Sequence, residues 1–326
     1  MPGLRSTNLM KAVVYDRYGG PEVLSIAEIP RPSPGPKQVL LQVHATSINL
    51  SDWETLLGTP LYSRIGGLRA PRRPVLGSDI AGRVEAVGSE VTLFAPGDQV
   101  YGDNLTLKGG FAEYAVAPES ALAHKPASLS FAEASTLPQA AAIATQGTAD
   151  IASGMSVLIN GAGGGSGAFA IQLAKAAGAH VTAVDNADKL AFMRSLGADE
   201  VIDYRTTDFT RTGPYDRVLD LVAHRSVFAY RRCVSRGGRY RCVGGTTRAL
   251  LRMATVGVVA GRVTGRRLGV LAVKEGPAHF TPLAELCVSG RIDIHIDRRF
   301  PLDETAAALE YAGTGHALGK VVVEIR

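Results

Sequence analysis

Residues 155–167, Met-Ser-Val-Leu-Ile-Asn-Gly-Ala-Gly-Gly-Gly-Ser-Gly, decide the fold of this chain. The apolar half, Met155–Asn160, is typical of a buried strand, and Ala168–Ala177 behind the glycines is typical of a helix. Glycine allows a tight turn and a close approach of backbone to ligand. A helix that opens directly after such a turn offers free N–H groups and the positive end of its dipole to a phosphate. The stretch therefore predicts a dinucleotide-binding loop.

Two registers of the glycine loop fit the dinucleotide fingerprint. Gly161, Gly164 and Gly167 have the spacing G-x-x-G-x-x-G, and Gly163 and Gly165 supply a G-x-G pair. Sequence spacing does not choose between the two registers. We therefore predict that the whole loop contacts the cofactor, namely Gly161, Ala162, Gly163, Gly164, Gly165, Ser166 and Gly167.

Strands and helices alternate on both sides of this loop. An alanine-rich helix with a kink at Pro138 is expected over Phe131–Ile151. Alternation of this kind predicts βαβ units and a parallel, doubly wound Rossmann-type sheet. The expected strands after the loop are His180–Asp185, Glu200–Asp203, Tyr215–Val222 and Arg239–Val243, with helices at Ala187–Leu196 and Ser226–Cys233 between them.

The first third of the chain has a different pattern, with short strands and frequent turns. Lys11–Tyr15, Val39–Ala45 and Ile80–Val87 are strand candidates, which together indicate a β-barrel-like domain. The pattern changes near Ser130, breaks up past residue 275, and Lys320–Ile325 is a final strand. We predict an α/β protein with a β-rich domain over 1–130 and 275–326, and a Rossmann domain over 131–274.

The second predicted strand of the Rossmann domain ends in an acidic residue. Asp185 lies about twenty residues past the loop, where a carboxylate accepts hydrogen bonds from ribose hydroxyls and repels a 2′-phosphate. This favours NADH. Lys189 and Tyr204 could instead reach a 2′-phosphate, so the sequence predicts NAD(P)H with NADH favoured and NADPH left open.

Charge and cysteine usage exclude several classes of protein. The net charge is +5, with arginines spread along 205–299 and no run of five like charges, so we expect a solvated surface and no nucleic-acid partner, with a basic binding patch as the alternative. Arginines interrupt the apolar stretch 249–273, so no membrane partner is expected. Three cysteines without C-x-x-C spacing and no apolar signal segment in 1–10 predict a cytoplasmic protein.

Several motifs resemble those of a known family. They are Lys11–Gly20, Ser47–Trp53, Leu76–Gly82, Pro96–Val100, the glycine loop, Leu196–Tyr204 and Gly319–Val322. Together they are similar to the medium-chain dehydrogenase/reductase superfamily, in its zinc-independent quinone oxidoreductase-like branch. The resemblance implies a GroES-like catalytic domain built from both chain ends, an inserted Rossmann domain and a homodimer paired through the Rossmann sheets.

The departures from the zinc-dependent members of that superfamily concern the metal. At the places of the Cys, His and Cys ligands this chain has Asn49, Ser78 and an alanine-rich segment near Gln139. Zinc prefers thiolate, imidazole or carboxylate ligands, so we expect no metal. Zinc-free members often carry a threonine before the glycine loop, whereas this chain has Ile143 there and Thr145 two residues on.

Without zinc, and with no Tyr-x-x-x-Lys in the chain, little stabilises charge on a simple ketone oxygen. A quinone or an enone delocalises that charge, so the expected activity is reduction of a small, hydrophobic, conjugated acceptor. The expected catalytic residues are Asn49, which the resemblance puts near the nicotinamide, Asp52 and Ser78, with Asp79 as support. Gly244, Gly245 and Lys320 are expected to approach the cofactor, and Tyr62 and Tyr101 to pack.

Two alternatives stay open at this point. One is a pathway-specific enoyl reductase or dehydrogenase acting on a natural product. The other is a non-catalytic dinucleotide-binding sensor, which the basic composition and Ile143 support. The stretch Thr247–Val273 is expected either to roof a hydrophobic substrate cleft, with Leu250 and Leu251 facing it, or to form the dimer contact.

Overall fold

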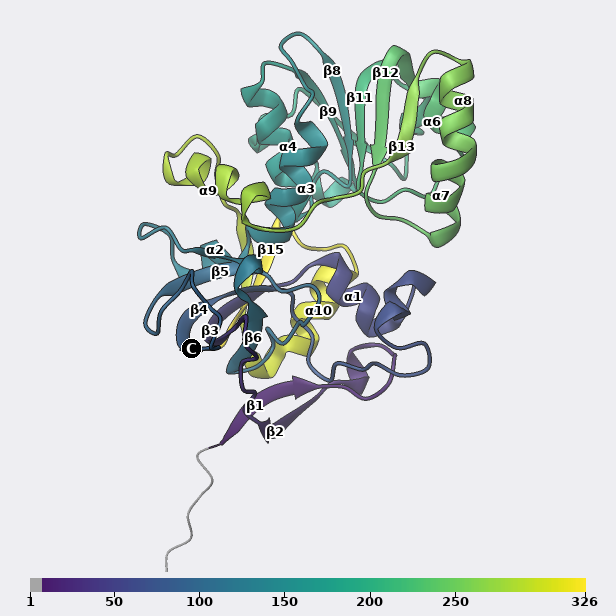
Figure 1. The fold of residues 1–326 in the computed structure, drawn as a ribbon. Helices are drawn as coiled ribbons and strands as arrows, with labels where there is room; N and C mark the ends of the chain where they lie inside the picture. The colour runs from purple at the N-terminus through teal and green to yellow at the C-terminus, as the bar shows by residue number, and fades with distance from the viewer. Residues whose placement is uncertain (1–7) are drawn as a thin grey trace, which may run out of the picture.

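A computed structural model describes residues 8–326 and shows two stacked parts (Figure 1). The chain begins in the lower part, builds the upper part with its middle third, and returns to the lower part with its C-terminal segment. Residues 1–7, which hold much of the stretch searched for a signal segment, lie outside the described residues. Within 8–326, no helix has both the length and the apolar character needed to cross a bilayer.

The upper part contains a six-stranded parallel sheet in the order β10-β9-β8-β11-β12-β13. Alternate residues of its central strand face opposite sides, since Val157 and Ile159 belong to one buried cluster and Leu158 to another. A sheet that is buried on both faces is the doubly wound arrangement that the sequence predicts. The strands are β8 (Ser156–Asn160), β9 (His180–Asp185), β10 (Glu200–Asp203), β11 (Tyr215–Asp220), β12 (Val234–Cys242) and β13 (Arg267–Val270).

Helices cover both faces of the parallel sheet. One buried cluster joins it to α3 (Pro138–Thr148), α4 (Gly165–Ala176), α5 (Leu190–Ser195) and α9 (Thr281–Val288). The other joins it to α6 (Val227–Cys233) and to the long helix made by α7 (Thr247–Arg252), one π-helical turn (Met253–Gly257) and α8 (Val258–Val263).

The alanine-rich segment forms two helices, and the prediction of one kinked helix is wrong. α2 (Phe131–Ser135) ends before Pro138, which starts α3. Proline lacks an N–H and fits the first turn of a helix, where that donor has no partner. α2 packs on the lower sheet, whereas α3 packs mainly on α4 of the upper part, so the break lets the chain pass from one part to the other.

The lower part holds a seven-stranded sheet in the order β14-β15-β3-β4-β5-β7, with β6 also paired to β3. All neighbours in it are antiparallel except β14 and β15. A second buried cluster packs α1 (Leu50–Leu57) and α10 (Thr305–Gly313) against this sheet. The strands are β3 (Gln38–Ser47), β4 (Asp79–Val87), β5 (Gln99–Asp103), β6 (Tyr114–Pro118), β7 (Leu122–His124), β14 (Ile296–Pro301) and β15 (Lys320–Glu324), beside the hairpin β1 (Leu9–Val14) and β2 (Ser25–Pro30).

The two sheets draw their strands from the parts of the chain that the predicted domain division assigns to them. Strands of the lower sheet come from both chain ends, and strands of the upper sheet come from 156–270. However, Phe280, Leu283 and Ala284 share a buried cluster with α3 and α4. α9 therefore packs on the upper part, although it follows residue 275. The boundaries at 130 and 274 remain our proposed division of the chain.

Candidate functional site

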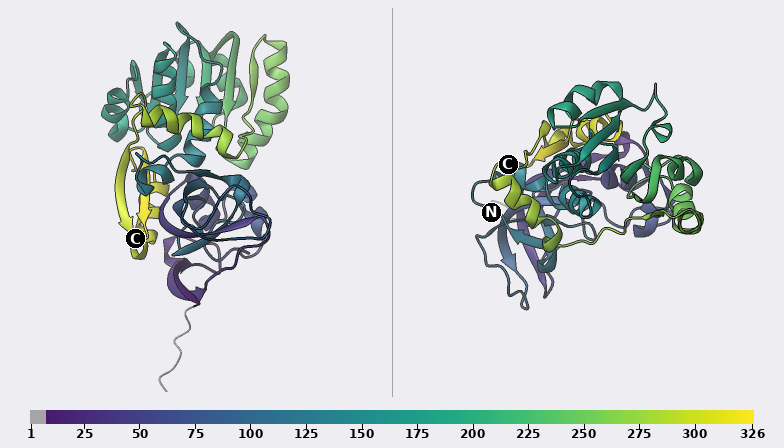
Figure 2. Two further views of the ribbon diagram at one scale, coloured as in Figure 1. Left: turned by 60° about the vertical axis from the view of Figure 1, so that its left-hand side comes forward. Right: turned by 90° about the horizontal axis from the view of Figure 1, so that it is seen from above.

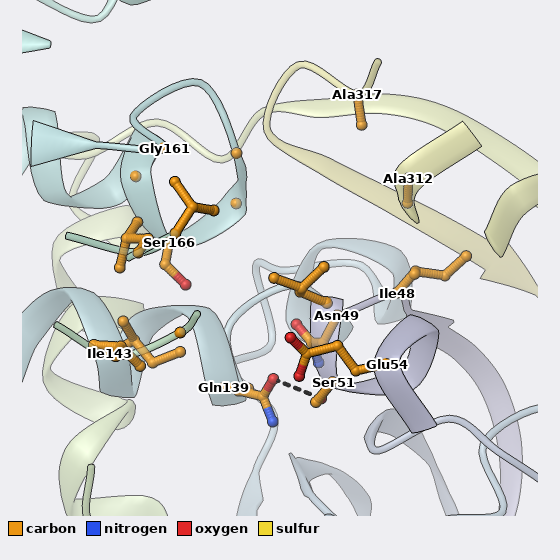
Figure 3. Close-up of a pocket in the computed structure, with 18 of the residues that line it drawn as sticks. Ile48, Asn49, Ser51, Glu54, Gln139, Ile143, Gly161, Ser166, Ala312 and Ala317 are labelled. Atoms are coloured by element: carbon orange, nitrogen blue, oxygen red, sulfur yellow. Dashed lines mark hydrogen bonds between the residues drawn. The ribbon is translucent and has the colours of Figure 1, made fainter. Parts of the chain in front are cut away.

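A cavity of about 720 Å³ lies between the two parts. Its walls come from the glycine loop and α3 on one side, and from α1 and the turn before β15 on the other. Figure 3 shows Asn49 and Glu54 facing Ile143 and Ser166 across this space. Both chain ends and the middle of the chain thus contribute to a single site.

The glycine loop has the geometry of a phosphate cradle. Gly161 has φ +78°, a conformation that favours glycine, and its N–H donates to the Val184 carbonyl at 3.0 Å. Helix α4 begins at Gly165 after the extended N-cap Gly164. A Cβ on Gly167 would lie 2.4 Å from the Gly161 carbonyl oxygen, so only glycine fits there. These three roles support the register Gly161, Gly164 and Gly167.

The cradle fits a dinucleotide. A Cβ on Gly164 would meet only the Gly161 carbonyl oxygen, at 3.6 Å, so the backbone is open to a ligand at this point. Gly165 and Ser166 also line the cavity, at the N-terminus of a twelve-residue helix where N–H groups lack intrahelical partners. Ala162 and Gly163 do not line it, so their expected cofactor contact is not seen. Ala162 is fully buried, and the side chain of Lys189 covers Gly163.

The expected ribose-binding residues meet at the far end of the cradle. Asp185 accepts hydrogen bonds from the Gly163 and Asn186 N–H groups, each at 2.9 Å. The Lys189 ammonium lies 3.8 Å from the Asp185 carboxylate, and burial lowers the pKa of Lys189. Tyr204 lines the same end. A ribose hydroxyl and a phosphate would thus both find partners here.

Asn49 and Lys320 form the polar centre of the cavity. Lys320 Nζ donates to Asn49 Oδ1 at 2.7 Å and to the Ile48 carbonyl at 3.1 Å. Both residues are buried and line the cavity. The Gly319 N–H donates to the Gly163 carbonyl, which ties this centre to the cradle. The Lys320 side chain also lies beside Gly165 of the glycine loop, and its approach to the cofactor remains a prediction.

The other expected catalytic residues lie behind Asn49 and do not line the cavity. Ser78 and Asp52 are fully buried; Asn49 Nδ2 donates to Ser78 Oγ at 3.4 Å, and Asp52 accepts the Asn49 N–H at 3.0 Å. Neither residue lines the cavity, so neither is placed to touch a substrate there. They orient Asn49 at the start of α1. Gly244 lines the cavity, whereas Gly245 holds a backbone bridge to Ala223.

The sequence reasoning missed a buried charged cluster around this centre. It contains the carboxylates of Asp52, Asp79 and Asp103 and the ammonium groups of Lys108 and Lys320. Lys108 lies 3.8 Å from Asp52, and Lys320 lies 3.6 Å from Asp79. Three carboxyl groups face two lysines, so one carboxyl lacks a counter-charge.

Asp103 is the unpaired carboxyl of that cluster. It sits at the end of β5 directly opposite Asp79 in the ladder, it lines the cavity, and its Oδ1 has no hydrogen-bond partner. Burial, followed by the carboxylates of Asp79 and Glu275, raises the pKa of Asp103 to about 8. Burial therefore favours the protonated form of this carboxyl, which lines the open space.

Helix α3 closes the cavity with Gln139 and Ile143. The Gln139 N–H donates to Asp79, and its side-chain oxygen accepts from Ser51 at 3.0 Å (Figure 3). Ile143 lines the cavity, whereas the Thr145 hydroxyl is buried without a partner. Within 8–326, no group of three His, Cys, Asp or Glu side chains could hold a metal ion. The donor set of Asn49, Ser78 and Gln139 does not fit zinc.

Apolar side chains from the upper part form the remaining wall. Leu250 lines the cavity, whereas Leu251 is 64% exposed, so the expected apolar roof uses only one of the two leucines.

Two tyrosines of the lower part lie near the site. Tyr101 is buried against Phe280 and packs, as expected. Tyr62 lines the cavity, and its hydroxyl lies 3.0 Å from Glu54 and 3.3 Å from the Gly245 carbonyl.

The apolar wall gives a size-dependent prediction. The Leu250→Ala variant is expected to raise the KM for a long-chain quinone about thirtyfold, because about 2 kcal/mol of apolar contact is lost, and to change the KM for 1,4-benzoquinone little. Steady-state kinetics with both quinones measure the difference. Leu251→Ala is the matched control and should change neither value. Equal effects of the two substitutions would contradict the observed orientation.

Two family patterns match the chain, "Zinc-binding dehydrogenase" over residues 196–323 and "Alcohol dehydrogenase GroES-like domain" over 35–127. Among curated proteins, a chloroplastic quinone oxidoreductase of Triphysaria versicolor is 34% identical, with 97% of this chain and 98% of the relative covered. A mitochondrial NAD(P)H oxidoreductase of Bos taurus is 33% identical, with 98% and 90% covered.

The fold agrees with a solved relative. The structure of the quinone oxidoreductase from Coxiella burnetii superposes with a TM-score of 0.89 at 32% identity, and the match covers 98% of this chain and all of the other. Identity above 30% over nearly full length, together with the cradle and the two matched patterns, shows the family. The chain belongs to the medium-chain dehydrogenase/reductase superfamily, in its quinone oxidoreductase-like branch, and is an NAD(P)H-type oxidoreductase.

Proposed function

We propose that this protein is a zinc-independent NAD(P)H-dependent reductase of a quinone or of an activated C=C bond. The main support is one cavity that joins the dinucleotide cradle to a chamber with apolar walls. The described side chains of this chamber include no set of ligands that would suit zinc. A conjugated acceptor suits such a chamber, because its own extended system takes up the charge of the added hydride. Positioning then supplies most of the catalysis.

The chain's own residues divide the work. Gly164, Gly165 and Ser166 would hold the pyrophosphate, and a nicotinamide bound beyond them supplies the hydride. Lys320 fixes the Asn49 side-chain oxygen and Ser78 accepts one N–H of the Asn49 amide, which leaves the second N–H to orient an acceptor oxygen. Ser78 and Asp52 hold Asn49 from behind.

We propose that Asp103 supplies the proton that follows hydride transfer. The carboxyl is buried, lacks a counter-charge and lines the cavity, and burial favours its protonated form where a reduced acceptor needs an acid. With a pKa of about 8, Asp103 holds this proton below pH 8 and loses it above. The kcat is therefore expected to be flat at pH 6–7 and to fall as pH rises through about 8.

The Asp103→Asn variant tests this assignment. It is expected to lower kcat at least a hundredfold at pH 7 and to remove the loss above pH 8, since a general acid contributes about 10²–10⁴-fold. The same substitution is expected to raise folding stability at high pH, although it lowers kcat. A carboxyl with a raised pKa destabilises the fold as pH rises through that pKa, so the neutral amide should unfold at a higher temperature at pH 9. An unchanged alkaline limb in this variant would assign the proton to another group.

Substrate profiling tests the proposed function as a whole. Oxidation of NADH and of NADPH is followed with 1,4-benzoquinone, cyclohex-2-enone and cyclohexanone. The conjugated acceptors should be reduced and the saturated ketone should not, because it leaves charge on a single oxygen with no zinc to hold it. Reduction of cyclohexanone at a comparable rate would contradict the proposal. A natural-product enoyl reductase would accept the enone only.

Three further points belong to the same proposal. The proposed cofactor preference is NADH, which the Asp185 carboxylate supports. If the site also accommodates the 2′-phosphate of NADPH, Lys189→Met should weaken NADPH binding more than NADH binding.

A homodimer would pair the edge of β13, which has one sheet neighbour in the described chain. The cytoplasm is the proposed compartment, supported by three cysteines that form no disulfide within 8–326.

A further inference from the structure

Two long segments of the chain contain no acidic residue. Between Asp220 and Glu275 there are eleven arginines and one lysine, and between Glu54 and Asp79 there are four arginines. Arg239 and Arg241 pair with Asp150, but Arg248, Arg252 and Arg262 are exposed and form no ion pair within 8–326. The excess positive charge is therefore free to act on a partner.

The same two segments expose large apolar side chains. Leu61, Ile65 and Leu68 are 68%, 84% and 74% exposed in the shorter segment. Leu251, Val259 and Val263 are 64%, 62% and 81% exposed on the outer side of α7 and α8. Isolated exposed apolar residues are ordinary, whereas several interleaved with arginines indicate a binding surface. We call the exposed side chains of 61–73 and 248–263 the docking face.

The two halves of the docking face lie on one side of the molecule, at the mouth of the cavity. Figures 1 and 2 show the segment after α1 beneath α7 on the same side as α8. The Tyr62 hydroxyl donates to the Gly245 carbonyl at 3.3 Å, which joins the shorter segment to the turn just before α7. Tyr62 and Leu250 line the cavity from either half. A surface bound here would border the route into the site.

We propose that the docking face binds the surface of an anionic lipid bilayer and takes a membrane-dissolved conjugated acceptor from it. Apolar side chains enter the interface between headgroups and acyl chains, and arginines pair with lipid phosphates. The location of the acceptor rests on the proposed function, whereas the lipid binding does not. The sequence expectation of no membrane partner rested on the lack of a spanning segment and on the spread of the arginines, with a basic binding patch as the alternative. Surface binding needs no spanning segment.

Charge and apolar content together select this occupant. A symmetric contact between two docking faces would place Arg248, Arg252 and Arg262 against a second basic face that has no carboxylate to pair with them. Nucleic acid would match the charge, but it offers no place for Ile65, Leu68, Val259 and Val263. An anionic bilayer satisfies both kinds of side chain.

Vesicle sedimentation with the full chain tests the proposal. Binding is measured to vesicles of phosphatidylcholine alone and of phosphatidylcholine with 30% phosphatidylglycerol. The wild type should bind the anionic vesicles and release them at high salt. The triple variant Arg248→Gln, Arg252→Gln and Arg262→Gln should lose roughly a hundredfold in affinity, since each basic residue strengthens binding about fivefold. The double variant Val259→Ser and Val263→Ser should weaken binding even at low salt.

A matched control uses the opposite side of the molecule. Val288 and Arg291 are exposed at the end of α9, which Figure 1 shows far from α8, and Val288→Ser with Arg291→Gln should bind vesicles as the wild type does. Equal binding to neutral vesicles, no binding at 1 mM anionic lipid, or an unaffected triple variant would overturn the proposal. So would dimerisation that only the serine variants lose, or tighter binding to duplex DNA.

Failure of the docking face can be separated from failure of the proposed function. Turnover of water-soluble 1,4-benzoquinone is measured without vesicles, and the triple variant should retain it because its three arginines lie outside the cavity. Turnover of a long-chain quinone in anionic vesicles should fall at least tenfold in that variant. Soluble turnover without vesicle binding overturns the docking face alone, and vesicle binding without turnover of any quinone overturns the reductase alone.

Discussion

Replacement of Gly167 by alanine is expected to weaken NADH and NADPH binding by roughly a hundredfold, or ~2.7 kcal/mol. A Cβ at this position would lie 2.4 Å from the Gly161 carbonyl oxygen and 2.5 Å from Ala162 Cα. Both contacts are backbone, so the first turn of α4 must move away from the loop. The cradle then widens, and its N–H groups no longer converge on the pyrophosphate. Fluorescence titration of each cofactor measures the loss.

The control for this prediction is another glycine of the upper sheet. Gly269 lies on β13 with a negative φ, and a Cβ there meets no atom within 4 Å. Gly269→Ala should leave both dissociation constants within about twofold of wild type. If Gly167→Ala binds either cofactor normally, the dinucleotide does not use this cradle.

Replacement of Lys320 by methionine should lower the free energy of unfolding by about 3–5 kcal/mol. Lys320 Nζ is buried, lies 3.6 Å from Asp79 and donates to Asn49 at 2.7 Å. Methionine fills a similar volume but removes one of only two ammonium groups among three buried carboxyls. The remaining charge must then be neutralised by proton uptake. Urea denaturation at pH 8 measures the loss, which should shrink as the pH falls towards 5.

A surface pair gives the comparison. Arg299 and Glu324 lie 2.6 Å apart, and both side chains are roughly half exposed. Arg299→Met should cost at most about 1 kcal/mol, because water solvates the remaining carboxylate. Similar losses at positions 299 and 320 would show that the buried cluster is not electrostatically coupled.

Much of the fold could be predicted from the sequence. The spacing of apolar residues and the glycines and prolines that end helices and strands are local features of the chain. β9 begins and ends at the predicted residues, and the glycine loop lies between a buried strand and a helix as predicted. Errors arose where tertiary packing decides. Pro138 starts a helix because the chain crosses between two cores there. Strand β13 was missed because four residues gain their strand character only by pairing with β12.

The site was harder to predict, because the sequence does not reveal which side chains face the cavity. Ser78 and Asp103 are both near strands of the lower sheet, yet only Asp103 reaches the open space. The pairing of Asp79 with Asp103 is a register property of β4 and β5. Lys320 could be placed through its motif, whereas Lys108 and Gln139 carried no spacing signal that marked them as partners of buried aspartates.

The proposed function depends on hydride transfer from a nicotinamide cofactor to a conjugated acceptor without zinc. The most direct test follows NADH and NADPH oxidation by 1,4-benzoquinone at 340 nm, on protein of known metal content before and after dialysis against a chelator. We expect turnover with one or both cofactors at a rate that the chelator does not change. Loss of turnover on chelation and its return with added zinc would contradict the claim, as would cofactor binding without turnover of benzoquinone or enone.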